Sequence, residues 1–159
     1  MKCALDVNKV PVDVDVEPRE LLVDVLRDRL GLTGTKVACD TAQCGSCVVH
    51  MDGVSVKSCQ VLAVQATGTS VVTIEGIGDG DDLTELQDRL WHAHAVQCGF
   101  CTPGVVMSLQ ELLAADPTPS ETQVRARLAG NLCRCTGYNS IVEAVVELAE
   151  QTPGATARG

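Results

Sequence analysis

The chain has 159 residues, a formal net charge of −9 and 45% hydrophobic residues. This length fits one ordinary domain or two small ones. The acidic charge, with no basic run, excludes a nucleic-acid binder, which needs positive charge to offset phosphate. Phe100, Trp91 and Tyr138 are the only aromatic residues, so a small domain of this chain buries little area per residue and needs a staple.

The first part of the chain predicts strands around one helix. Alternation from Val10 to Val16 has the two-residue period of a half-buried strand, and Leu5 and Val7 indicate a partner strand across a turn at Asn8-Lys9. A helix is expected to begin at Pro18 and to end at Gly31. One face of that helix would carry Leu22, Val25, Leu26 and Leu30.

Two further strands flank Asp52-Gly53, a strong two-residue hairpin signal. These strands are Val48 to Met51 and Val54 to Val56, and a last strand is expected from Val71 to Ile74. Residues 1–76 therefore predict a small α+β domain. A linker rich in Gly and Asp follows at residues 77–82.

Residues 83–151 predict a second domain made of four helices. The expected apolar stripes are Leu83, Leu86 and Leu90; Val105, Val106, Leu109, Leu112 and Leu113; Val124 and Leu128; and Ile141, Val142, Val145, Val146 and Ala149. Ser120 and Gln123 form a capping box before the third of them. The polar tail, residues 152–159, is expected to be disordered.

The start of the chain lacks a basic stretch followed by an apolar run, and no apolar run has the length of a membrane span. These features predict a cytoplasmic protein. Disulfides are disfavoured in that compartment, and close-set cysteines there usually bind metal.

Eight of the nine cysteines fall into two sets of four. The first set is spaced C-x4-C-x2-C-x11-C and comprises Cys39, Cys44, Cys47 and Cys59. This is the spacing of plant-type ferredoxins, in which a tight loop brings thiolates around a [2Fe–2S] cluster. Gly45 lets the backbone approach closely, and loop N–H groups can donate to sulfur.

The second set joins a C-x2-C pair to a C-x-C pair and comprises Cys98, Cys101, Cys133 and Cys135. Each pair lies at a helix end, so antiparallel helices could bring the four together. Structural zinc also takes four thiolates and stays an alternative for this set. Together the two sets favour two [2Fe–2S] clusters. Cys3 is left over as a buried or edge residue, and no histidine is needed to complete either set.

Longer motifs carry a resemblance to a known family. Residues 97–104 (QCGFCTPG) and 130–138 (GNLCRCTGY) resemble the two signature segments of the xanthine dehydrogenase/aldehyde oxidase family of molybdenum hydroxylases. Cys44-Gly45-Ser46-Cys47 and Ser58-Cys59 resemble the ferredoxin-like domain of the same family. Residues 51–59, 63–66 and 73–76 are similar to the small subunit of aerobic carbon monoxide dehydrogenase.

The resemblance implies a β-grasp, ferredoxin-like domain followed by an all-α four-helix [2Fe–2S]-binding domain. It implies an electron-transfer subunit that relays electrons from a molybdopterin centre, in its cytosine dinucleotide form, to FAD. Both of those cofactors would lie on partners, a large molybdopterin subunit and a medium FAD subunit, in a dimer of heterotrimers. Gln97 and Cys135 match the family residues that lie nearest the pterin. The substrate of the complex would be carbon monoxide, an N-heterocycle or an aldehyde.

Three other functions stay open on the sequence alone. A free ferredoxin shuttle would be a monomer with both clusters shielded. A zinc-stabilised binding module would be colourless, whereas two [2Fe–2S] clusters give a red-brown protein. A family member without a flavin subunit would pass its electrons to an external acceptor.

Overall fold

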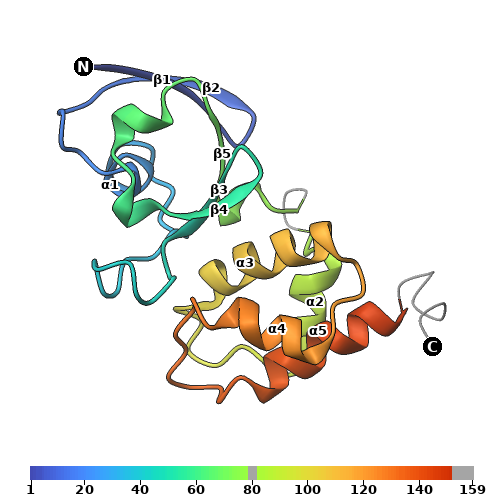
Figure 1. Cartoon of the computed structure of the whole chain (residues 1–159). Helices are drawn as coiled ribbons and strands as arrows, with labels where there is room; N and C mark the ends of the chain where they lie inside the picture. Colours follow the sequence, from blue (N-terminus) through green and yellow to red (C-terminus); the bar gives the residue numbers. More distant parts are fainter. Residues whose placement is uncertain (79–81, 152–159) are drawn as a thin grey trace.

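The computed structural model describes residues 1–78 and 82–151, which form a sheet and a group of helices packed side by side (Figure 1). The strands are β1 (Lys2–Val7), β2 (Val10–Asp15), β3 (Val48–Met51), β4 (Val54–Lys57) and β5 (Ser70–Val72). They lie in the order β2-β1-β5-β3-β4, with β1 and β5 parallel and the other neighbours antiparallel.

Both predicted hairpins are confirmed. Asn8 and Lys9 join β1 to β2 with φ of 52° and 68°, and Asp52 and Gly53 join β3 to β4 with φ of 51° and 83°. Two central residues with positive φ match the right-handed twist of the flanking strands. These turns therefore set the register of both pairs.

One helical segment covers the sheet, but the prediction that it begins at Pro18 is wrong. The segment starts with α1 (Leu22–Asp24) and continues as the π-helical turn η1 (Val25–Arg29). Leu21 forms a bridge with Leu62, so its backbone stays extended and the helix begins only after it. Gly31, with φ of 71°, follows the end of the helix as expected.

The helix places its apolar face on the sheet, as predicted. Its buried side chains join those of the strands in one core, which contains Leu5, Val7, Val16, Leu22, Val25, Leu26, Val49, Ala63, Ala66 and Val71. Two short 3-10 turns, η2 (Ser58–Gln60) and η3 (Ala63–Ala66), connect β4 to β5. This sheet around one helix is the expected β-grasp arrangement.

The last strand ends earlier than predicted. β5 stops at Val72, and Ile74 belongs to the 3-10 turn η4 (Ile74–Gly76). The Asn8 side chain accepts a hydrogen bond from the N–H of Thr73 at 2.9 Å and donates to its hydroxyl at 3.0 Å. A side chain therefore takes the place of the strand neighbour at this position.

The described residues 82–151 form four helices, as predicted. They are α2 (Glu85–His92), α3 (Thr102–Ala115), α4 (Glu121–Leu128) and α5 (Asn139–Gln151). Their common core contains Leu86, Leu90, Ala95, Val105, Val106, Leu109, Val124, Leu128, Ile141, Val142, Ala144, Val145 and Leu148. The capping box of Ser120 and Gln123 is confirmed. Leu83 is a wrong prediction, since it precedes α2 and is 56% exposed.

Helix α3 packs against strands β3 and β4 and so joins the two halves. The Nε2 atom of His50 lies 2.7 Å from the carbonyl oxygen of Met107. A carboxylate oxygen of Glu111 accepts from the N–H of Ser55 at 3.1 Å and is also paired with Arg127. These polar contacts fix the helix on the sheet.

The fold class is α+β, with a ferredoxin-like half and a helical half. The predicted domain limits, residues 1–76 and 83–151, stay a proposal. Part of the predicted linker 77–82 and the whole predicted tail 152–159 lie outside the described residues. Within the described ranges, no helix is long and apolar enough to cross a membrane.

Candidate iron–sulfur centres

The first set of cysteines lies on the loop between η1 and β3 and on the 3-10 turn after β4. The loop wraps tightly because Asp40, Ala42 and Gly45 all have positive φ, of 53°, 62° and 72°. Such left-handed residues turn successive N–H groups toward one point, which favours negative charge there. The loop can therefore present several N–H donors to sulfur.

Cys39 receives such donors. The N–H groups of Thr41 and Cys44 lie 3.4 Å and 3.3 Å from its Sγ atom. These hydrogen bonds, first that of Thr41, lower the pKa of Cys39 to about 6. The thiolate, which is the form that binds iron, is stabilised at this position.

Cys47 and Cys59 form the buried side of the first set. The two thiols are hydrogen-bonded to each other, and burial raises the pKa of Cys47 to about 11. The hydroxyl of Ser58 donates to the carbonyl oxygen of Cys47 at 2.7 Å, which ties the turn after β4 to the loop. The structure therefore brings Cys59 to the loop, as predicted.

The second set lies between helices. Cys98 and Cys101 precede α3, and Cys133 and Cys135 lie on the loop from α4 to α5. The Sγ atoms of Cys98 and Cys135 are 3.6 Å apart. Cys101 and Cys133 are also hydrogen-bonded through their thiols, and burial raises the pKa of Cys101 to about 12. The four predicted residues therefore meet as two pairs.

The paired arrangement fits a two-iron cluster. Among residues 1–78 and 82–151, no three Cys, His, Asp or Glu side chains converge on a point that could hold a single metal ion. A [2Fe–2S] cluster makes a different demand, because its four thiolates are shared between two irons. The second set forms two thiol pairs, and in the first set Cys47 pairs with Cys59 while the N–H of Cys44 lies against the Cys39 Sγ atom, so both sets fit this arrangement.

One cavity, of about 530 Å³, is lined by the four cysteines of the second set and by Cys44 of the first. Its lining contains Ala38, Cys44, Ser46, Cys98, Phe100, Cys101, Leu132, Cys133, Arg134, Cys135 and Tyr138. Phe100 and Leu132 are 46% and 56% exposed although both are apolar. An apolar rim around partly exposed sulfur is typical of a surface that a partner covers.

The loops that carry the two sets are in direct contact. The N–H of Leu132 donates to the carbonyl oxygen of Cys44 at 2.8 Å, and the side-chain amide of Asn131 donates to that of Gly45 at 3.1 Å. A side chain on Gly45 would collide with the carbonyl oxygen of Gly130, and one on Gly104 with that of Gly45. Glycine is required at both places because backbone packs on backbone.

Sequence reasoning missed the role of Asn131 and Gly104. Both lie inside the quoted family segments, but spacing gives no sign that they contact the other half of the chain. Asn131 is 3% exposed and its contact with Gly45 spans 86 positions. Its burial, which only the fold shows, is the feature that marks it, since a buried polar side chain needs a hydrogen-bond partner.

Gln97 and Cys135, the residues expected nearest the pterin, are both exposed. Their side of the molecule also holds the exposed Cys98. Cys3 is buried in the core of the sheet domain, and its thiol donates to the carbonyl oxygen of Ala63 at 3.1 Å. His92 pairs with Asp88 on α2.

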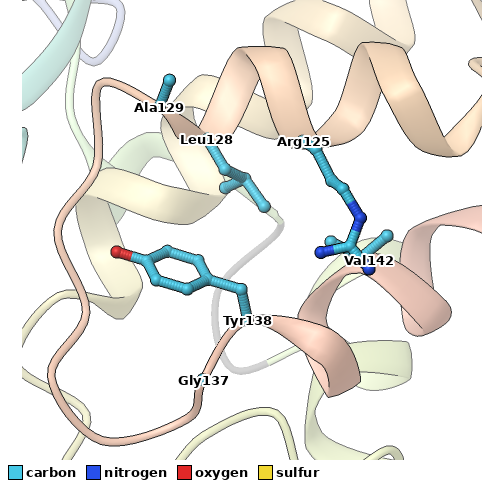
Figure 2. A pocket seen from close by; sticks show the side chains of 6 residues that line it. All are labelled: Arg125, Leu128, Ala129, Gly137, Tyr138 and Val142. Atoms are coloured by element: carbon cyan, nitrogen blue, oxygen red, sulfur yellow. The ribbon is translucent and has the colours of Figure 1, made fainter.

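A second hollow, of about 350 Å³, lies between α4 and the start of α5 (Figure 2). It is lined by Arg125, Leu128, Ala129, Gly137, Tyr138 and Val142, and contains no cysteine. Figure 2 shows the Tyr138 hydroxyl turned away from Arg125. The ring of Tyr138 therefore forms a wall of the hollow, while its polar end serves the loop.

Comparison with known proteins gives both halves a family. Residues 5–69 match the 2Fe-2S iron-sulfur cluster binding domain, and residues 73–146 match the [2Fe-2S] binding domain. The two matched segments follow the sheet half and the helical half in order.

Two bacterial relatives match over most of their length. The chain is 48% identical to the nicotine 6-hydroxylase small subunit of Paenarthrobacter nicotinovorans, over 90% of this chain and 86% of the relative. It is 43% identical to the caffeine dehydrogenase subunit gamma of Pseudomonas sp. (strain CBB1), over 94% of this chain and 91% of the relative.

A solved structure agrees in fold as well. One chain of quinoline 2-oxidoreductase from Pseudomonas putida 86 superposes with a TM-score of 0.91 and 46% identity, covering 94% of each chain. Sequence, fold and the paired cysteines point the same way. The chain belongs to the family of small iron–sulfur subunits of molybdenum hydroxylases.

Proposed function

We propose that this chain holds two [2Fe–2S] clusters and carries electrons between two partner subunits of a molybdenum hydroxylase. The proposed ligands of the first cluster are Cys39, Cys44, Cys47 and Cys59, and those of the second are Cys98, Cys101, Cys133 and Cys135. The observation that carries the proposal is the direct contact between the loops of the two sets, through Leu132 and Cys44.

A bound [2Fe–2S] cluster supplies one-electron transfer. The residues of the chain supply the environment: N–H groups of the first loop stabilise negative charge at Cys39, and the core buries Cys47 and Cys59. Such hydrogen bonds and burial set the potential of a cluster. The chain itself makes and breaks no substrate bond in this account.

The two exposed sides of the chain suggest the direction of transfer. We assign the surface around Gln97 and Cys135 to the molybdopterin subunit. We assign the surface around Cys39 to the FAD subunit. Between the two sides, one hydrogen bond links Cys44 to Leu132, the residue before Cys133. Charge passing from pterin to flavin can thus stay within this chain.

The finer composition of the complex is also proposed. We assign to it a large subunit with molybdopterin cytosine dinucleotide, a medium FAD subunit, a dimer of heterotrimers and a cytoplasmic location. The apolar rim of Phe100 and Leu132 supports a permanent partner rather than a free shuttle. This rim also separates the proposal from a soluble ferredoxin.

We propose that the complex oxidises an N-heterocycle. Two relatives, at 48% and 43% identity, are named for nicotine and caffeine, and one solved structure is named for quinoline. The likeness to the carbon monoxide dehydrogenase small subunit stays a prediction. Substrate contacts are expected on the large subunit, so its active-site loop decides between these classes.

The proposal is tested in the assembled complex with Cys135→Ser. Flavin reduction by an N-heterocycle that the complex oxidises should be lost under anaerobic conditions. Cys3→Ser is the matched control, because the same change is made at a buried thiol that bonds only a carbonyl of its own domain in the contacts described. Undiminished flavin reduction in Cys135→Ser contradicts the proposed route.

A further inference from the structure

The Thr136 side chain makes a contact with sulfur that neither motif spacing nor family assignment explains. Its hydroxyl donates to the Sγ atom of Cys133 at 3.1 Å. The N–H of the same residue lies 3.5 Å from that atom. Among the hydrogen bonds described, Cys133 is the cysteine of the second set whose Sγ atom accepts from a hydroxyl.

The direction of this hydroxyl is fixed from the other side. Its oxygen accepts a hydrogen bond from the N–H of Tyr138 at 3.2 Å. An oxygen that accepts there directs its own proton elsewhere, and Cys133 Sγ lies in reach. The Thr136 hydroxyl therefore accepts from the Tyr138 N–H and donates to the Cys133 Sγ atom.

Tyr138 holds the loop that makes this contact possible. Its hydroxyl accepts from the N–H of Cys133 at 2.7 Å and donates to the carbonyl oxygen of Asn131 at 3.0 Å. Tyr138 itself has a φ of 69°. A non-glycine residue in this conformation is held there by its surroundings. Both ends of the Thr136 contact are consequently anchored.

We propose that the Thr136 hydroxyl sets the reduction potential of the helical-domain cluster by hydrogen-bonding to its ligand Cys133. This inference rests on the proposed function, which places a cluster there. Reduction adds negative charge to the cluster and its sulfurs. A donor aimed at one of those sulfurs stabilises the reduced form and raises the potential.

The test is a redox titration of the assembled complex followed by EPR, with Thr136→Val, which removes the hydroxyl at nearly constant shape. One of the two cluster potentials should fall, and the other should stay. At a fixed applied potential, the reduced-to-oxidised ratio of that cluster should drop by about threefold to tenfold, where tenfold is about 59 mV for one electron.

Two further variants separate the hydrogen bond from packing. Thr136→Ser keeps the hydroxyl and should keep the potential of the native protein. Thr122→Val makes the same chemical change in the first turn of α4 and should move neither potential. Equal potentials in Thr136→Val and the native protein overturn the proposal, as does an equal shift in Thr136→Val and Thr136→Ser.

If Thr136→Val loses the cluster, Thr136→Ala decides whether the cause is a steric clash or the missing hydroxyl, because alanine is too small to clash. If the alanine variant loads iron, its potential must be lowered. If neither loads iron while Thr136→Ser does, the hydroxyl holds the cluster rather than tuning it, and the proposal fails. The proposed function fails separately, if the native complex contains no iron on this chain.

Discussion

Gly45 shows how much one residue contributes to the contact between the two cysteine loops. Its φ of 72° favours glycine, and a side chain there would strike the Gly130 carbonyl. Gly31 has nearly the same φ, 71°, with open space around it. A comparison of the two glycines therefore separates the free-energy cost of a left-handed backbone from the cost of a steric collision.

We expect Gly31→Ala to lower the stability by about 1–2 kcal/mol, the cost of a left-handed backbone for a residue with a side chain. Gly45→Ala should lower it further and should reduce the iron content, because the loop must move. Thermal unfolding and iron analysis of the two variants measure this difference. Equal losses in both would mean that the loop contact is unimportant.

Cys39 and Cys47 should titrate far apart in the metal-free chain. Hydrogen bonds from the N–H groups of Thr41 and Cys44 place the pKa of Cys39 at about 6, and burial places that of Cys47 at about 11. Since the thiolate is the reactive form above the pKa, Cys39 should be alkylated at pH 7 and lose reactivity as the pH falls through about 6.

Mass spectrometry of iodoacetamide-treated protein over a pH series measures this difference. The pH at which alkylation reaches half its maximal rate should lie several units lower for Cys39 than for Cys47. Coincident profiles would show that the loop N–H groups do not point at Cys39 in the metal-free state.

Among the elements, α3 and α4 depend on one half-buried ion pair. Glu111 of α3 pairs with Arg127 of α4 and accepts from Ser55 of β4. Glu121 and Arg125 form an exposed pair within α4. Removing a partner from a buried polar group leaves the others unsatisfied, whereas exposed pairs contribute little.

Glu111→Ala is expected to cost about 1–3 kcal/mol and Glu121→Ala about 0.3–0.5 kcal/mol in the free energy of unfolding. Burial would raise the pKa of Glu111, but hydrogen bonds from Ser55 and the charge of Arg127 lower it overall. A carboxyl with a lowered pKa stabilises the fold above its unfolded pKa, about 4.3, and this contribution is lost as the pH falls through the folded value.

Thermal unfolding of both variants at pH 7 and in mild acid tests this. The gap between Glu111→Ala and the native protein should narrow as the pH falls below about 4. A gap that is independent of pH would contradict the role of the carboxylate.

The elements were predictable where local chemistry decides them. Asp52-Gly53 and Asn8-Lys9 fix hairpins by turn geometry alone, and Ser120 with Gln123 fixes a helix start. The start of α1 was missed because Leu21 pairs with Leu62, a contact 41 positions away that no local pattern carries. Leu83 was misplaced because α2 is capped at Thr84.

At the scale of the whole molecule, the sequence could predict both cysteine sets but not how close together the two sets lie in space. The contact between Gly45 and Asn131 depends on how the two halves pack, since the two residues are 86 positions apart in the sequence. Spacing describes each loop on its own. The role of Thr136 needed side-chain geometry for the same reason.

Asn131→Ala tests that contact. It removes a buried amide that is bonded to the Gly45 carbonyl, so the two loops should separate. The magnetic interaction between the two reduced clusters in EPR should weaken. Asn139→Ala, the same change at an exposed position, should leave it unchanged. An unaltered interaction in both variants would show that the Asn131 amide does not hold the loops together.

Both sets of cysteines are proposed to hold iron at once, and the metal content of the chain measures this most directly. Protein purified from its native complex should contain about four irons and about four acid-labile sulfides per chain, two of each per cluster. Zinc in place of iron, or about two irons per chain, would contradict the account.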